Sequence, residues 1–91
     1  MYIVDLNEKA IEDIEKHRKS GDKQALKKVK QLIDELEIHP KTGNGKPKPL
    51  TGYNGIRWSR RITDIHRLVY DIFEFEKIVE ITQAWGHYED K

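Results

Sequence analysis

The spacing of the apolar residues changes halfway along this chain, and that change limits the folds open to it. Between Asp22 and Pro40 the apolar residues recur at helical spacing, namely Leu26, Val29, Leu32, Ile33 and Leu36. From Ile56 onward apolar and polar residues alternate, which is typical of strands with one buried face. A loop rich in glycine and proline, at 41–54, separates the two patterns. The sequence therefore predicts helices first and a sheet afterwards.

The N-terminal half begins with a short apolar, β-branched segment at 2–6, which predicts a strand. Asn7 can cap a first helix that ends near Ser20, and Ile11 and Ile14 mark its expected buried face. Asp22 can cap a second helix, and Pro40 ends it by disfavouring helical backbone at the preceding residue. Only a few residues separate the helices, so we expect an antiparallel helical hairpin.

The C-terminal half predicts three strands, at 56–63, 67–75 and 77–85. The short gaps between them favour hairpins and therefore antiparallel pairing. The expected order is β-α-α-β-β-β in one domain spanning 1–91. The fold class is α+β, with two N-terminal helices packed on one face of a four-stranded antiparallel sheet.

Composition excludes several classes of site. The chain has 91 residues and no cysteine, which rules out disulfides and thiolate metal sites. Its four histidines, at 17, 39, 66 and 87, include no close pair of the kind that zinc sites use. We therefore expect no metal and no cofactor. No apolar run approaches the ~20 residues of a membrane span and no leader opens the chain, so we expect no membrane contact and a cytoplasmic location.

Positive charge is concentrated in one segment of a nearly neutral chain. Between Lys41 and Arg67 seven Lys/Arg oppose the single acid Asp64, a local charge of +6 against +1 for the whole sequence. The flanking segments, 1–39 and 68–91, are balanced or acidic. Such a field attracts polyanions, above all phosphate backbones. Because several of these arginines lie in strand-like sequence, a preformed phosphate site is expected.

The expected fold brings residues suited to RNA cleavage to one edge of the sheet: Lys46, Lys48, Arg57, Arg61, Arg67, His87 and Tyr88. Metal-free cleavage needs a base for the ribose 2′-OH, cations for the phosphorane and an acid for the leaving 5′ oxygen. Histidine suits either proton transfer because its ordinary pKa is ~6.5. Tyrosine can stack on a base.

Four segments of this sequence resemble the YoeB/Txe family of bacterial toxins, within the RelE-like superfamily: GKPKPL at 45–50, WSRRIT at 58–63, HRLVY at 66–70 and GHY at 86–88. The resemblance implies a microbial-RNase-like fold. It also implies a toxin of a type II toxin–antitoxin system that is a metal-independent, ribosome-dependent endoribonuclease, cutting mRNA in the decoding site. The implied partners are the ribosome with its mRNA and a cognate, YefM-like antitoxin. A homodimer is also expected, because members of the family form dimers and because tryptophans are expected at the surface.

The resemblance also implies roles for single residues. Arg67 falls on the arginine that stabilises the phosphorane, His87 on the general acid and Tyr88 on the residue that stacks on the substrate base. Arg61 matches a further phosphate-binding arginine. Lys46 and Arg57 are added as phosphate ligands from the charge pattern alone.

One position departs from the family. The loop pattern GKPEPL carries a glutamate taken as general base, and here that position is Lys48. A protonated lysine cannot accept the 2′-OH proton, although repulsion from Arg61 and Arg67 would favour its neutral form. Two readings stay open: a lysine that substitutes for the base, and an attenuated or detoxified toxin. The first reading keeps the ribonuclease activity, and the second reduces it.

Simpler roles compete with the catalytic ones. Arg60 shares a face with apolar residues and fits a structural ion pair, while Arg57 also fits a solvated charge. His66 fits a structural hydrogen bond better than proton transfer. We expect His17 and His39 at the surface, and Trp58 and Trp85 in the core or an interface. At the level of the whole chain, the alternatives are a non-catalytic module that binds RNA or antitoxin, and a structural part of a repressor complex.

Overall fold

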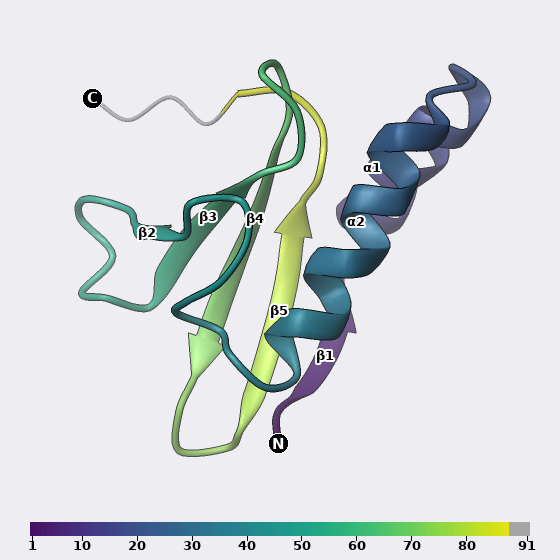
Figure 1. Cartoon of the computed structure of the whole chain (residues 1–91). Coiled ribbons are helices and arrows are strands. Elements are labelled where there is room, and N and C mark those ends of the chain that lie inside the picture. Colours follow the sequence, from purple (N-terminus) through teal and green to yellow (C-terminus); the bar gives the residue numbers. More distant parts are fainter. Residues whose placement is uncertain (88–91) are drawn as a thin grey trace.

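The computed structural model of this protein describes residues 1–87 and leaves Tyr88 to Lys91 outside the described part. Figure 1 shows two helices lying along one side of a twisted sheet. The elements in chain order are β1 (Ile3–Leu6), α1 (Glu8–Lys19), α2 (Lys23–Leu36), β2 (Lys48–Pro49), β3 (Arg57–Arg61), β4 (Arg67–Phe73) and β5 (Ile78–Gln83).

The α+β class and the two helices packed on the sheet are confirmed, but the expectation of four antiparallel strands is wrong. The sheet has five strands in the order β1-β5-β4-β3-β2. β1 runs parallel to β5, whereas the other neighbours are antiparallel. Hairpin reasoning sets direction only for strands joined by short turns, and β1 reaches β5 through most of the chain. β2 is two residues long and contains Pro49, which an edge strand tolerates.

Both helices begin where their caps predict. The side chain of Asn7 accepts a hydrogen bond from the Ala10 amide, and that of Asp22 accepts one from Ala25. The second helix ends at Leu36, before Pro40. No helix in the part of the chain that the structure describes is long and apolar enough to cross a bilayer.

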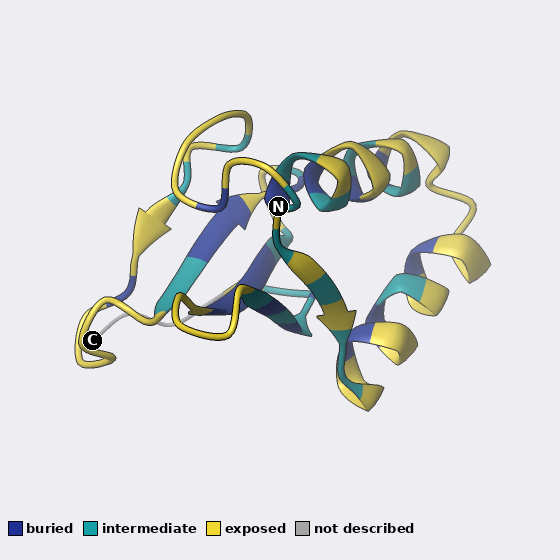
Figure 2. Cartoon of the chain, turned by 90° about the horizontal axis from the view of Figure 1, so that it is seen from below, coloured by how far each residue is buried: buried dark blue, intermediate teal, exposed yellow. Residues whose placement is uncertain are grey.

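The helical hairpin buries one side of each helix against the sheet, and the exposed residues point outward (Figure 2). Along α2 the buried residues are Ala25, Val29, Leu32 and Leu36, as the spacing predicts. Along α1 the prediction is partly wrong, because Ile11 is 57% exposed. The buried residues of α1 are instead Ala10, Asp13 and His17, so the expected surface position of His17 is also wrong.

The two faces of the sheet differ. Alternating residues of β3, β4 and β5 join the helices in one core, among them Leu68, Tyr70, Ile72, Val79 and Ile81. The opposite face carries Arg57, Ser59 and Arg61 of β3, the alternation that the sequence predicts. This second face holds the candidate site.

Candidate functional site

Arg60 fixes the loop that leads into the site. Its side chain is fully buried, and its guanidinium donates to Glu35 (Nη1 to Oε1, 2.9 Å) and to the Tyr70 hydroxyl (Nε to Oη, 3.1 Å). It also donates to carbonyls of the loop, those of His39, Thr42 and Asn44. The structural role expected for Arg60 is confirmed, and it consists of holding residues 39–44 against α2 and β3.

Glu35 completes this anchor from α2. Burial acts to raise its pKa, but hydrogen bonds from Asn44 and Arg60 outweigh burial and lower the pKa below its ordinary value. Glu35 is therefore charged at neutral pH and accepts from both the loop and the buried guanidinium.

Gly45 brings the loop into direct contact with the end of β3. Its carbonyl accepts from the Arg61 amide at 2.6 Å, and its φ is +82°. A Cβ at this position would lie 2.9 Å from the Arg61 carbonyl oxygen, closer than such contacts are found. Only glycine fits here without a shift of the backbone. The close approach holds Lys46 beside Arg61.

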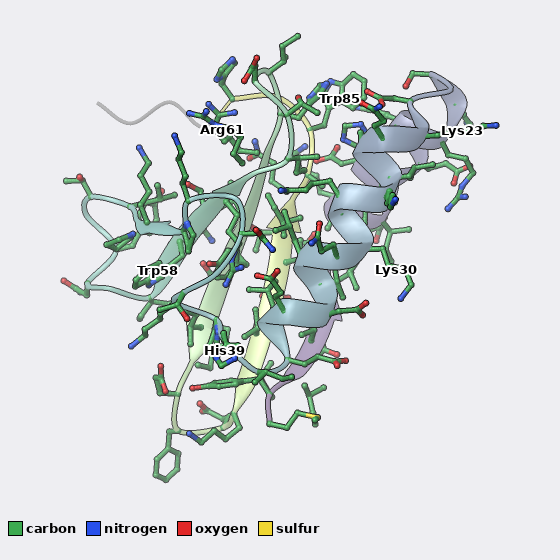
Figure 3. All side chains as sticks on the ribbon, viewed as in Figure 1. Lys23, Lys30, His39, Trp58, Arg61 and Trp85 are labelled. Carbon is green, nitrogen blue, oxygen red and sulfur yellow. The ribbon has the colours of Figure 1, made fainter. Side chains whose placement is uncertain are left out.

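These contacts shape a hollow of about 150 Å³ on the sheet face away from the helices. Strand pairing explains its composition, because Lys48 lies opposite Ser59 and Arg61 lies opposite Arg67. Figure 3 shows the labelled Arg61 on the side of the sheet away from α1 and α2. The residues that line the hollow are Gly45, Lys46, Lys48, Ser59, Arg61 and Arg67.

Arg67 links this hollow to the C-terminal segment. Its amide donates to the Gly86 carbonyl at 3.0 Å, so His87, the next residue, begins beside Arg67. The side chain of Arg67 is oriented by the preceding turn, where Nη1 donates to the Thr63 carbonyl at 2.9 Å. Nε and Nη2 have no partner among residues 1–87, which leaves two donor atoms for a ligand. His87 itself is exposed.

A second set of contacts holds the same segment from behind. The Gly86 amide donates to His66 Nδ1 at 2.9 Å, so the structural hydrogen bond expected for His66 is present. The His66 ring packs on Trp85 and, edge-on, on His17. Burial, followed by the nearby His17, lowers the pKa of His66 below its ordinary value.

The helix α1 supplies two buried polar residues to this arrangement, and sequence reasoning missed both. Asp13 accepts from the Ala84 amide at 3.0 Å, and His17 Nε2 lies 2.7 Å from the Ala84 carbonyl, as its donor. They satisfy both backbone groups of one residue just past β5. A signal did exist, because Ala10, Asp13 and His17 follow helical spacing on one face.

The hollow gathers cations that make no ion pair with the described residues. Seven lysines and arginines form ion pairs with carboxylates, and none of those seven lines the hollow: Lys9, Lys16, Arg18, Lys30, Lys41, Arg57 and Arg60. Within residues 1–87, none of the four cations that line the hollow has a carboxylate partner. Four like charges without a counter-ion destabilise a fold, and an anionic ligand would remove that cost.

The structure thus brings together Lys46, Lys48, Arg61 and Arg67. His87 follows Gly86, whose carbonyl accepts from the Arg67 amide. It does not bring Arg57 there, because that guanidinium makes a two-pronged pair with Asp71 at 2.7 and 2.9 Å. Arg57 is therefore neither a solvated charge nor part of the hollow. Tyr88 lies outside the described residues. Residues 1–87 contain no group of three or more His, Asp or Glu that could hold a metal ion.

A family model of YoeB-like toxins of bacterial type II toxin–antitoxin systems matches residues 6–88. This chain belongs to that family. A relative at the sequence level is Toxin YoeB of Streptomyces coelicolor, 40% identical over 72 residues, which covers 79% of this chain and 83% of the relative. The chain is thus a YoeB-like toxin, and the resemblance noted from its motifs is confirmed.

Solved structures give the same fold. A YoeB/ParE toxin from Agrobacterium tumefaciens superposes with a TM-score of 0.84 at 32% identity, covering 94% of this chain and 99% of that one. A YoeB dimer from Staphylococcus aureus gives 0.80 at 28% identity, with 96% and 98% covered. The heterotetrameric YoeB-YefM complex of the same organism gives 0.77 at 28% identity, with 97% and 99% covered.

Proposed function

We propose that this YoeB-like toxin is a metal-independent, ribosome-dependent endoribonuclease that cleaves mRNA in the decoding site. The single observation that supports the proposal most is the hollow of about 150 Å³, whose four cations have no carboxylate partner within residues 1–87. One of them, Arg67, donates its backbone amide to the carbonyl of Gly86, the residue before His87. A phosphodiester has the size and charge that such a hollow favours.

In the proposed reaction the ribose 2′ oxygen attacks the adjacent phosphorus and gives its proton to a solvent water, because no carboxylate of residues 1–87 lines the hollow. The phosphorane that forms carries extra negative charge, which Arg61 and Arg67 stabilise from the two paired strands β3 and β4. The bond from phosphorus to the 5′ oxygen then breaks, and His87 gives that oxygen a proton. The products are a 2′,3′-cyclic phosphate and a free 5′ hydroxyl. The proposed stacking of Tyr88 on the substrate base rests on the family motif.

Lys48 makes the first proton transfer the weak step. It lies in β2 opposite Ser59, within the hollow, where the family places its glutamate base. As a cation it adds to the stabilisation of the phosphorane but does not accept the 2′-OH proton. We therefore propose an enzyme that binds its substrate well and cleaves it slowly.

The same hollow suits an acidic antitoxin segment. The Staphylococcus aureus neighbour is a YoeB-YefM complex, and we propose a YefM-like antitoxin for this chain as well. An acidic, disordered segment that folds over the unpaired cations would neutralise them and exclude mRNA. The ribosome and its mRNA are the remaining partners, which places the toxin in the cytoplasm. By likeness to the dimeric neighbour we also propose a homodimer.

The proposal is tested by His87→Ala with His39→Ala as the matched control, since both histidines are exposed and His39 lies near the C-terminal end of α2 (Figure 3). Single-turnover cleavage of ribosome-bound mRNA should fall by a factor of ~10² or more for His87→Ala, because the leaving oxygen loses its proton donor. Ribosome binding, measured by co-sedimentation, should stay within about twofold. His39→Ala should match the wild type in both. An equal loss of cleavage and binding in His87→Ala would contradict the proton-transfer role.

Lys48 favours a second candidate, a module that binds RNA or antitoxin and performs no chemistry. The two candidates differ in one measurement on the unmodified chain. If wild-type protein saturates the ribosome and the mRNA stays intact over hours, the binding module is correct.

A further inference from the structure

A second hollow, of about 300 Å³, adjoins the first. Gly45, Lys46 and Arg61 line both hollows, so these three residues form a ridge between them. On its far side the second hollow adds Lys28 from α2, together with Thr63 and Asp64 from the turn after β3. The proposed cleavage chemistry makes no use of this hollow.

Lys28 differs from the other lysines of its helix. Lys23, Lys27 and Lys30 are exposed, and Lys30 pairs with Asp34. Lys28 is half-buried and has no carboxylate partner among residues 1–87. Its ammonium group therefore has no counter-charge among the described residues, and an anionic ligand would supply one.

The charge around the second hollow is positive although an acid is present. Lys28, Lys46 and Arg61 oppose the single carboxylate of Asp64, which forms no ion pair in the described structure. Three donors of charge-assisted hydrogen bonds thus surround a space larger than the first hollow. The chemistry suits one phosphate group.

We propose that the second hollow binds the phosphate of a nucleotide next to the scissile one, with Lys28 as the residue that distinguishes this subsite. The inference rests on the proposed function, since it takes the first hollow to hold the scissile phosphate. A single strand that crosses the ridge of Lys46 and Arg61 has one phosphate on each side of it. RNA is a better occupant than an acidic peptide, because the two hollows adjoin and a nucleic-acid backbone repeats its charge at fixed intervals.

The direct test compares Lys28→Ala with Lys27→Ala, a neighbouring exposed lysine that lines a different hollow beside Ile38. The probe is a short fluorescein-labelled RNA with 2′-O-methyl groups throughout, which cannot be cleaved. Its binding is measured by anisotropy between ~50 and ~200 mM salt. Lys28→Ala should bind about tenfold more weakly, with a salt slope smaller by ~0.7, the value for one phosphate contact to a single strand. Lys27→Ala should match the wild type within about twofold.

A scan with neutral linkages locates the phosphate. One methylphosphonate is placed at each position of the probe in turn. The wild type should lose affinity at the scissile linkage and at one neighbouring linkage, and Lys28→Ala should lose nothing further at that neighbour. Lys28→Gln repeats the measurement if Lys28→Ala is poorly folded by thermal unfolding.

The results separate the subsite from the reaction. An unchanged salt slope in Lys28→Ala, an equal loss in Lys27→Ala, or coupling only to the scissile linkage would each overturn the subsite. Weaker binding of an acidic peptide with unchanged RNA binding would assign the hollow to a protein partner instead. Failure of the wild type to cleave ribosomal mRNA would remove the proposed reaction while the RNA-binding result still decides the subsite.

Discussion

Arg60 and Arg61 are adjacent in the sequence, yet the two faces of β3 use them in opposite ways. Arg60 points into the core, is fully buried and donates to a carboxylate, a hydroxyl and three carbonyls. Arg61 is exposed on the other face, opposite Arg67, and has no carboxylate partner within residues 1–87. The same side chain thus serves stability on one face and is left available on the other.

Burial and hydrogen-bond partners together distinguish a structural charge from a functional one in this small protein. A buried guanidinium without partners would be very costly, and the guanidinium of Arg60 accordingly has hydrogen-bond acceptors for Nε, Nη1 and Nη2 within the fold. Lys46, Arg61 and Arg67 form a cluster without carboxylate partners among residues 1–87, which costs less because water screens it, but the repulsion remains. The cluster is where the proposed function places a ligand, whereas Arg60 has all its partners within the fold.

The comparison predicts its largest effect for Arg60→Met. Removing the guanidinium leaves Glu35, the Tyr70 hydroxyl and the loop carbonyls without their donor, in a part of the fold with little water. The free energy of unfolding, measured in urea, should fall by about 3–5 kcal/mol. Arg61→Met should change it by no more than ~0.5 kcal/mol, because the Arg61 side chain is exposed and makes no ion pair within residues 1–87.

The effect of Arg61→Met should instead appear in the rate of cleavage. Arg61→Met should slow cleavage of ribosome-bound mRNA by about tenfold or more while remaining fully folded. A stable Arg60→Met, or an unfolded Arg61→Met, would show that Arg60 is not the structural arginine and Arg61 the functional one.

An effect smaller than the loss of stability in Arg60→Met is expected at Lys48, where the test is whether the hollow lacks a base. Lys48→Glu restores a carboxylate where the family pattern has one, and single-turnover cleavage should rise by about 10- to 100-fold. Lys46→Glu is the matched control, because it places the same charge in the same hollow one residue beyond Gly45. That variant should slow cleavage, since it only weakens phosphate binding. An unchanged or slower rate for Lys48→Glu would remove the idea of a missing base.

Much of this division was visible in the sequence. Alternation placed Arg60 with Trp58 and Ile62 on the core face and Arg61 with Ser59 on the other, and the structure agrees. The caps Asn7 and Asp22 set the helix starts. These are local signals, and each depends on residues a few positions apart.

The parts that the sequence did not predict depend on distant contacts. The parallel pairing of β1 with β5 and the short β2 follow from how remote segments meet, which spacing does not encode. The burial of His17 and Asp13 follows from the need of the Ala84 backbone for partners, 67 and 71 residues away in sequence. The pair between Arg57 and Asp71 likewise appears only once β3 and β4 are in register.

The smallest predicted effect concerns His66, which contacts Trp85 and Gly86 in the segment that leads to His87. In the folded protein burial lowers the pKa of His66 below 6.5, and its Nδ1 accepts from the Gly86 amide. A lowered histidine pKa favours the neutral form, so this contribution to stability is complete above pH 6.5 and is lost as the pH falls through the folded-state pKa. Protonation would place a hydrogen on Nδ1 and break the bond to Gly86.

His66→Asn tests this directly, because an amide oxygen accepts the same hydrogen bond and does not titrate. The free energy of unfolding of the wild type should decline more steeply than that of His66→Asn between about pH 7 and pH 5. His17, Asp13, Asp22 and His87 act on His66 and are present in both proteins, so the difference between the two curves isolates His66. The protection of the Gly86 amide against hydrogen exchange, relative to its intrinsic rate at each pH, should fall over the same range in the wild type alone. Parallel curves would show that the contact with Gly86 does not depend on the charge of His66, and that the core side supports His87 by packing on Trp85 instead.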